Sequence, residues 1–194
     1  MKLKLGILWT LLFYSGIAFA EEIPDKIRAW MGLQSWERDR SGPVVSLGTP
    51  GQFDDKHIFA PIVAQENHDF LMWYCGSRGA VDERLFRVSL ATSADGLDFT
   101  RCEDNPVFEF GDGERSALTP TLLRSPNGTV LRENGRLRMW FCAAALQEKD
   151  GVHTLHEIQS DDGILWSRPS EAQLQYVYAP TIVRDGRNYR MWYV

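Results

Sequence analysis

The sequence lacks the features that mark several common classes of ligand-binding protein. It has three cysteines in 194 residues, with no Cys-x-x-Cys pair and no mixed Cys/His metal spacing, so it predicts neither a disulfide framework nor a structural zinc site. No run of Lys or Arg forms a basic stripe and the net charge is −5, which argues against nucleic acid as a partner. We therefore predict no metal, no cofactor and no nucleic-acid partner.

Long apolar runs are also scarce, and the one that exists lies at the N-terminus. Lys2 and Lys4 precede an apolar stretch over residues 5–19, and Ala-Phe-Ala ends at Ala20 just before two glutamates. These are the three parts of a secretory signal peptide, whose apolar core is too short for a membrane span. Residues 1–20 thus predict a secreted or periplasmic protein without membrane association after cleavage, with an uncleaved anchor as the alternative.

The sequence does contain an internal repeat. Ser-x-Asp-Gly-x-x-aromatic-x-Arg occurs at 93–101 and again at 160–168, and Met-Trp-aromatic-Cys occurs at 72–75 and at 139–142. Both pairs are 67 residues apart, as Asp95 and Asp162 show. A third marker, a Pro followed by apolar residues, occurs three times, at Pro61, Pro120 and Pro180. Coincident markers at one register indicate a chain built from repeated units.

Each unit has the composition of short strands. Runs rich in β-branched and aromatic residues alternate with Gly, Asn and Asp, which predicts an antiparallel meander. Asp95-Gly96 and Asp162-Gly163 supply the chemistry of tight turns, and the aromatic residue after each turn is expected to pack between neighbouring sheets. Cys75 and Cys142 occupy equivalent strands, where we expect them to be buried and too far apart to bridge.

A period near 60 residues made of short strands predicts an all-β propeller. After the signal, residues 21–35 form a lead-in. Residues 36–194 then divide into half a blade around Trp36 and Pro43, two whole blades and a final half blade.

The repeated segments resemble a known superfamily. The stretch FDDKHIFAPIV, followed by MWYCG, LATSADGLDFTR and NPV and by a second round, is similar to the five-bladed β-propellers of arabinanases, levansucrases and invertases, which include glycoside hydrolase families 32, 43, 68 and 130. The resemblance covers residues 36–194. It implies that the first strand of each blade lines a central channel and that acidic residues near its start carry out hydrolysis.

Five such units require roughly 300 residues, and only about three blades are present here. We therefore expect the chain to be the N-terminal portion of a longer protein or a truncated gene product.

Glycoside hydrolysis requires two carboxylates, one to protonate the leaving oxygen and one to activate water or attack the sugar. The candidates are Asp54, Asp55 and Glu114, of which Asp55 and Glu114 both lie six residues before a marker Pro. His57 shares a strand face with Asp55 and is a weak substrate-binding candidate. So is Tyr178, which stands two residues before Pro180, where family 43 enzymes typically carry the acidic Glu.

The most specific function that follows is a secreted, glycoside-hydrolase-like propeller that hydrolyses glycosidic bonds of an oligo- or polysaccharide by acid/base chemistry. One alternative is a non-catalytic glycan-binding propeller that uses its Trp and Tyr residues as stacking platforms. Another is a truncated, inactive scaffold fragment.

Overall fold

The computed structural model describes residues 25–28, 30–80, 84–125, 127–148 and 151–194. The chain divides into two compact units, Met1–Ser41 and Gly42–Val194. The described part of the first contains a four-residue helix, α1 (Asp25–Arg28), and a contact between the rings of Trp30 and Trp36. The predicted signal peptide lies outside the described residues. In the described ranges, no helix is both long and apolar enough to cross a membrane.

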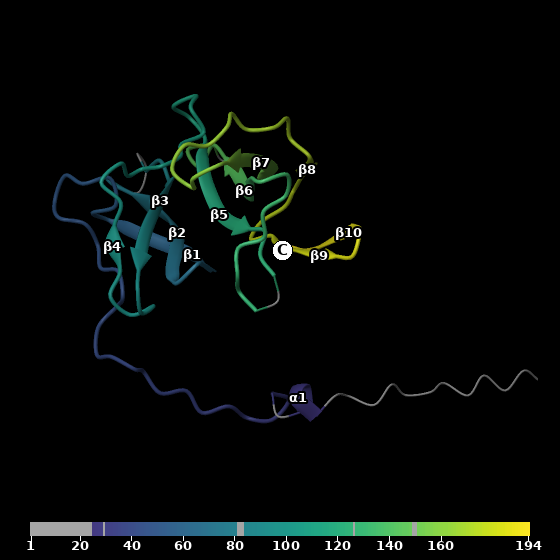
Figure 1. Cartoon of the computed structure of the whole chain (residues 1–194). Coiled ribbons are helices and arrows are strands. Elements are labelled where there is room, and N and C mark those ends of the chain that lie inside the picture. Colours follow the sequence, from purple (N-terminus) through teal and green to yellow (C-terminus); the bar gives the residue numbers. More distant parts are fainter. Residues whose placement is uncertain (1–24, 29, 81–83, 126, 149–150) are drawn as a thin grey trace, which may run out of the picture. The chain divides into compact units, whose positions relative to one another are not determined.

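The second unit consists of antiparallel β-sheets whose strands follow one another along the chain (Figure 1). Sheet 1 contains β1 (His57–Glu66), β2 (Asp69–Ser77), β3 (Arg87–Ser93) and β4 (Thr100–Arg101). Sheet 2 contains β5 (Ser116–Leu122), β6 (Leu137–Ala144), β7 (Thr154–Ser160) and β8 (Leu174–Gln175). A hairpin of β9 (Thr181–Asp185) and β10 (Asn188–Trp192) follows. The predicted all-β meander of each unit is confirmed.

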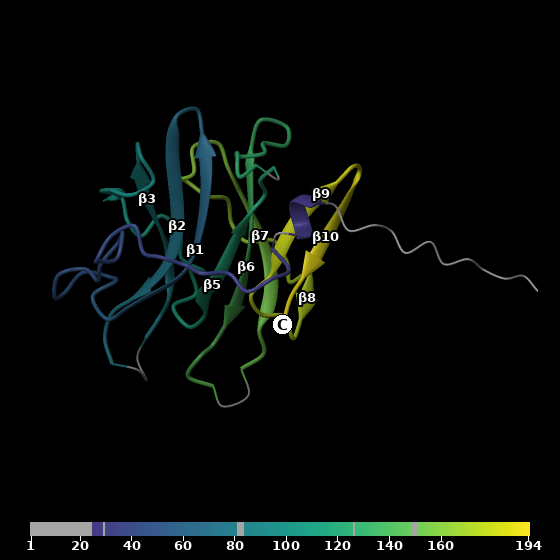
Figure 2. The same ribbon diagram turned by 90° about the horizontal axis from the view of Figure 1, so that it is seen from below.

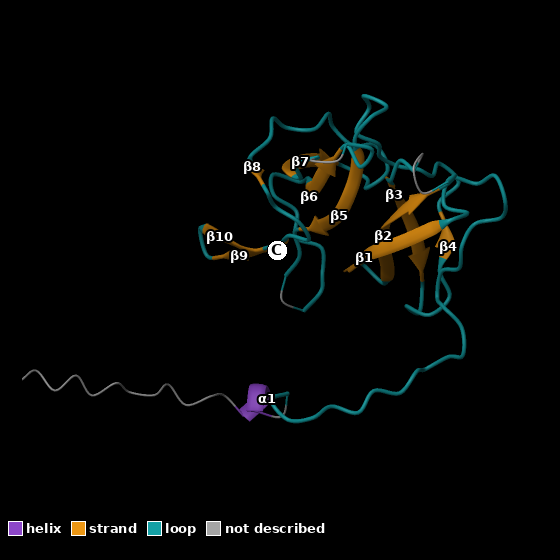
Figure 3. Cartoon of the chain, turned by 180° about the vertical axis from the view of Figure 1, so that it is seen from behind, coloured by secondary structure: helices purple, strands orange, loops and turns teal. Residues whose placement is uncertain are grey.

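The two predicted half units differ in the structure. The final one is the β9–β10 hairpin. The N-terminal one, predicted around Trp36 and Pro43, is not formed by strands: residues 30–56 are turns, bends and irregular chain (Figure 3). A strand needs a neighbour for its backbone hydrogen bonds; among the described residues 30–56, Lys56 donates to the Ser77 carbonyl at 3.3 Å, and the stretch before it forms no ladder with a sheet edge.

Sheet 1 packs face to face against sheet 2, and the hairpin follows in the same succession (Figure 2). Side chains alternate across β2, so Trp73 points into the core shared with Leu137, Met139 and Phe141 of sheet 2. Trp73 and Phe141 are fully buried. At about 25 cal/mol per Å² of apolar area, burial of such large side chains is the main source of stability for the paired sheets.

The buried thiols tie each sheet to the next unit. Cys75 of β2 donates to the carbonyl of Ala117 at 3.5 Å, and Cys142 of β6 donates to the carbonyl of Val177 at 3.1 Å. Both cysteines are free and fully buried, which confirms their predicted packing role. Ala117 and Val177 each lie three residues before a marker Pro. The thiols therefore hold equivalent points of the repeat, one in β5 and one in the segment before β9.

The repeated Ser-x-Asp-Gly motif closes a turn, as predicted. The Ser93 hydroxyl accepts hydrogen bonds from the amides of Asp95 and Gly96, and the Asp95 carboxylate accepts from those of Leu97 and Asp98. These amide hydrogen bonds lower the pKa of Asp95 to about 2. Ser160, Asp162 and Gly163 repeat the arrangement in the second copy. The motif is thus a self-capping turn in both units.

The second copy of this turn also carries an inter-sheet contact. The Trp73 indole donates to the carbonyl of Gly163 at 3.0 Å, and the Trp73 and Trp166 rings pack edge to face. A Cβ on Gly163 would lie 2.8 Å from Trp73 Cζ2. On Gly96, the equivalent residue of the first copy, it would lie 3.5 Å from the Phe70 ring.

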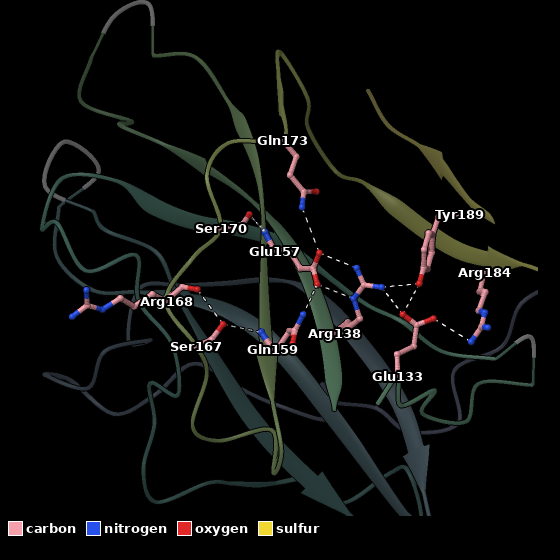
Figure 4. A network of polar contacts seen from close by, with 10 residues as sticks. All are labelled: Glu133, Arg138, Glu157, Gln159, Ser167, Arg168, Ser170, Gln173, Arg184 and Tyr189. Carbon is pink, nitrogen blue, oxygen red and sulfur yellow. Dashed lines mark hydrogen bonds and ion pairs between the residues drawn. The ribbon is translucent and has the colours of Figure 1, made fainter. Parts of the chain in front are cut away.

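An ion-pair network holds the hairpin against sheet 2 (Figure 4). Arg138 of β6 binds Glu157 of β7 through two hydrogen bonds of 2.7 and 2.9 Å and also bonds Glu133 and the Tyr189 hydroxyl of β10. Hydrogen bonding to Glu157 raises the pKa of Arg138. Arg184 of β9 pairs with Glu133 at 3.1 Å. Both strands of the hairpin are thereby connected to sheet 2.

The two equivalent glycines allow the inter-sheet contact to be measured. Their φ angles are nearly equal, +77° at Gly96 and +81° at Gly163, so replacement by Ala imposes the same backbone strain at both. We expect Gly163→Ala to lower the free energy of unfolding by about 1–2 kcal/mol more than Gly96→Ala, because only the first forces Trp73 to move. Urea unfolding of the two variants would test this; equal losses would contradict it.

Candidate functional site

Three strained backbone steps mark the same place in successive first strands. Ala60, Thr119 and Ala179, each directly before a marker Pro, have φ angles of 51°, 46° and 49°. Positive φ is unfavourable for residues that carry a Cβ, and such strain concentrates at functional sites. In β1 and β5 the step coincides with a bulge, between Phe59 and Ile62 and between Leu118 and Thr121. Bulges of this kind are frequent beside active sites, where they redirect side chains.

On one side of these steps lies a cavity of about 820 Å³, which we call the channel cavity. Its walls are residues 60–62 of β1, 119–122 of β5 and 179–184 at and before β9, with loop residues Arg124, Ser125, Asn127 and Gly128. The first strands of all three units therefore surround one cavity. This is the arrangement that the resemblance implied for a central channel.

On the other side of the steps lies a second cavity of about 620 Å³, the mouth cavity. It is formed at the starts of the first strands, by residues 56–59, by Leu118 and by Tyr178, and it is completed by side chains from four other segments: Leu47, Arg84 and Phe86, Leu146, and His153. A mostly apolar wall with a few polar groups is typical of small-molecule sites.

Two aromatic groupings shape the mouth cavity. The Phe86 ring lies 4.9 Å from that of Phe59 and 5.9 Å from that of His57. The His57 Nδ1 is 3.2 Å from the Ser77 hydroxyl, a hydrogen bond that fixes the ring. Across the cavity, His153 and Tyr178 pack edge to face at 5.0 Å. Burial raises the pKa of Tyr178, so its hydroxyl is protonated and able to donate at neutral pH.

The structure brings together two of the residues predicted from sequence. His57 and Tyr178, the substrate-binding candidates, line the mouth cavity from different units. The catalytic candidates Asp54, Asp55 and Glu114 line neither the mouth cavity nor the channel cavity.

Asp54 has the surroundings of a structural residue. It is fully buried, and its Oδ2 accepts hydrogen bonds from the Tyr74 hydroxyl and the Arg101 Nε, both at 3.0 Å. Burial and the Asp54 carboxylate raise the pKa of Tyr74. Asp54 Oδ1 faces Gly48, where a Cβ would come within 2.2 Å. The carboxylate fastens the chain before β1 to β2 and β4 through Oδ2, while Oδ1 is buried without a hydrogen-bond partner among the described residues.

Asp55 and Glu114, which both lie six residues before a marker Pro, do not occupy equivalent sites in the structure. Asp55 is half-buried; its Oδ2 accepts from the Gly51 amide at 2.7 Å, and its Oδ1 is buried without a hydrogen-bond partner among the described residues. Glu114 lies exposed on a loop whose turn is closed by Asp112. The common offset from a marker Pro therefore leads to two different environments.

Five basic residues of the two cavities were not identified from sequence as binding residues. Lys56, Arg84 and His153 line the mouth cavity, and Arg124 and Arg184 line the channel cavity. Arg184 follows Pro180 by four residues and Arg124 follows Pro120 by four. That shared offset is a signal in the repeat, whereas nothing local distinguishes Arg84 or His153.

Comparison with known sequences gives distant relatives. No family model matches the chain. The uncharacterized protein Rv1502 of Mycobacterium tuberculosis is 26% identical in an alignment of 163 residues, and the match covers 78% of this chain and 52% of that protein. The corresponding uncharacterized protein of a second Mycobacterium tuberculosis strain matches equally well. The chain thus spans about half the length of the curated relatives it matches.

Solved structures show the fold more clearly. The Bombyx mori GH32 β-fructofuranosidase BmSUC1 superposes with a TM-score of 0.56 at 14% identity, over 73% of this chain and 30% of that enzyme. A variant of the same enzyme was solved in complex with sucrose, with a TM-score of 0.54 at 14% identity over 68% of this chain and 28% of that one. A putative glycosidase from Bacteroides thetaiotaomicron gives 0.51 at 18% identity, over 73% and 46%. The chain therefore has a glycoside-hydrolase-like all-β fold.

The structural role of Asp54 can be tested by substitution. Asp54→Ala leaves the Tyr74 hydroxyl and the Arg101 guanidinium without their shared acceptor, so we expect the free energy of unfolding to fall by about 2–3 kcal/mol. Asp104→Ala removes an exposed carboxylate of a nearby loop and is expected to change stability by less than about 0.5 kcal/mol. Denaturant unfolding measures both. Equal, small effects would show that Asp54 is not the anchor.

Proposed function

We propose that the chain binds a saccharide in its mouth cavity, as part of a secreted protein of glycoside-hydrolase type. One observation supports this most: the mouth cavity lies at the starts of the first strands, beside the three strained steps. This is the end of the channel at which the superfamily it resembles carries out its chemistry. The fold is shared with several glycoside hydrolases, one of them solved with sucrose.

The lining residues suit a sugar. Tyr178, which is 37% exposed, offers an apolar ring face against which the C–H groups of a sugar can pack. His57 and His153 supply ring nitrogens at the same wall, which can donate or accept hydrogen bonds with hydroxyl groups. Few polar groups placed among aromatic ones fix orientation while most contact area remains apolar.

Hydrolysis is a second candidate function, favoured by the position of Asp55. Its Oδ1 is buried without a hydrogen-bond partner among the described residues, as is that of Asp54; the Oδ2 of Asp55, however, accepts only from the Gly51 amide, whereas that of Asp54 is held by Tyr74 and Arg101. Asp55 also precedes His57 of the mouth cavity by two residues. As general base, Asp55 would accept the proton of a water molecule that adds to the anomeric carbon. A second carboxylic acid would protonate the leaving oxygen; the described walls of the two cavities contain no Asp or Glu, so this acid is not one of their residues.

Binding can be tested with one substitution and a matched control. We expect Tyr178→Ala to weaken saccharide binding about tenfold, because it removes an aromatic wall of the mouth cavity. Tyr193→Ala removes a tyrosine that is 54% exposed and lines neither cavity, and it should leave affinity unchanged. A glycan array identifies the ligand and calorimetry measures its affinity. Equal affinity of both variants, or no binding to any glycan, would contradict the proposal.

Turnover requires its own experiment on whatever glycan binds. We expect Asp55→Asn to lower kcat/KM by about 10²–10⁴-fold, as removal of a general base does, while leaving binding nearly intact. Glu114→Gln serves as the control, since Glu114 is exposed and outside both cavities. Turnover that survives Asp55→Asn would exclude Asp55 as the base. Binding without any turnover would leave the non-catalytic reading as the function.

A further inference from the structure

The walls of the two cavities carry a charge opposite to that of the whole chain. The chain has 26 acidic and 21 basic residues. Yet the described residues that line the mouth and channel cavities include four cationic side chains and no Asp or Glu: Lys56, Arg84, Arg124 and Arg184. Two other cavities have both signs of charge in their walls, as in the one where Asp54 and Glu103 lie beside Arg101. The cationic side chains are therefore concentrated in the walls of the mouth cavity and the channel cavity.

These cations differ in how far the protein itself neutralises them. Arg184 pairs with Glu133 at 3.1 Å, and Arg124 donates to the carbonyl of Val63. Arg84 stands over the Phe86 ring at 5.7 Å, and its Nε is buried without a hydrogen-bond partner among the described residues. A buried guanidinium donor without an acceptor is unfavourable, and a bound anion would supply that acceptor.

We propose that the saccharide of the mouth cavity is acidic and carries uronic-acid carboxylates, with Arg84 as the main specificity-determining residue. This inference rests on the proposed function, since it assigns the chemical class of the ligand at the same site. A planar guanidinium matches a carboxylate through two parallel hydrogen bonds, which a neutral hydroxyl group does not offer. Lys56 and Arg124 add a field that attracts the acidic chain from both sides of the strained steps.

The experiment compares one trisaccharide in two charge states. Trigalacturonic acid and its fully methyl-esterified, neutral form are titrated into the full chain by calorimetry. We expect the acid to bind at least about tenfold more tightly than the ester, and the difference to shrink as salt is raised. Arg84→Gln should abolish most of this preference. Arg187→Gln makes the same charge change at an exposed site that lines neither cavity, and should preserve it.

The possible outcomes separate the two proposals. If both forms bind equally, or if Arg84→Gln retains the preference, the acidic assignment is overturned while saccharide binding stands. If a trisaccharide that carries sulfate groups and no carboxylates binds more tightly than the uronate, the carboxylate assignment is overturned. If no saccharide binds to a chain whose thermal unfolding is cooperative, both proposals are overturned. Arg84→Lys is the conservative variant: it keeps the positive charge but loses the two parallel donors. It should therefore show more of the preference for the acid than Arg84→Gln does, and less than the unaltered chain.

Discussion

The structure depends on the burial of one sheet face against the next. An antiparallel sheet with two apolar faces cannot stand alone in water, so sheet 1 is stable only because Trp73 and its neighbours are covered by sheet 2. The same contact fixes the geometry of the cavities. When Trp73 bonds to the carbonyl of Gly163, it sets how closely the sheets approach and hence how far apart β1 and β5 lie.

Opposite faces of sheet 1 are stabilised by different kinds of interaction. Trp73 and Cys75 pack toward sheet 2, whereas Tyr74 points to the chain before β1, where Asp54 and Arg101 meet its hydroxyl. The first arrangement is apolar and tolerant of small shifts in position. The second is a buried polar cluster whose geometry must be satisfied. A segment without strands is thereby held as firmly as a strand would be.

The fold could be predicted from sequence because repetition made weak signals strong. Met-Trp-aromatic-Cys, the Ser-x-Asp-Gly turn and the marker Pro each occur elsewhere in proteins, but their common register left few alternatives, and sheets 1 and 2 follow it. The half blade around Trp36 shows the limit of this reasoning. A strand exists only if another edge binds it, and a motif in one segment says nothing of whether that edge is present.

The site was harder to predict, for a related reason. His57 was identified because it shares a strand face with Asp55, and Tyr178 because it stands two residues before a marker Pro; both line the mouth cavity. The carboxylates were chosen by their position before a marker Pro. Asp54 and Asp55 are adjacent, so this position does not show which way each side chain points. Asp54 turned toward Tyr74 and Arg101, and Asp55 did not. That direction depends on tertiary partners that lie 20 and 47 residues away along the chain.

The bulge at each strained step has a consequence for the evolution of the repeat. Three residue steps of β1, from Phe59 to Ile62, span the same distance as two steps of β2, from Cys75 to Trp73, and β5 and β6 repeat this count. One extra residue reverses the alternation of a strand, so the parity of the inward-facing positions changes at the step. Loops of the chain can lengthen freely, as the second unit does between Pro120 and Met139. Loss of a single residue at the step would instead exchange the wall-facing and core-facing side chains along half a strand, so a change of length there disrupts the unit in a way that a longer loop does not.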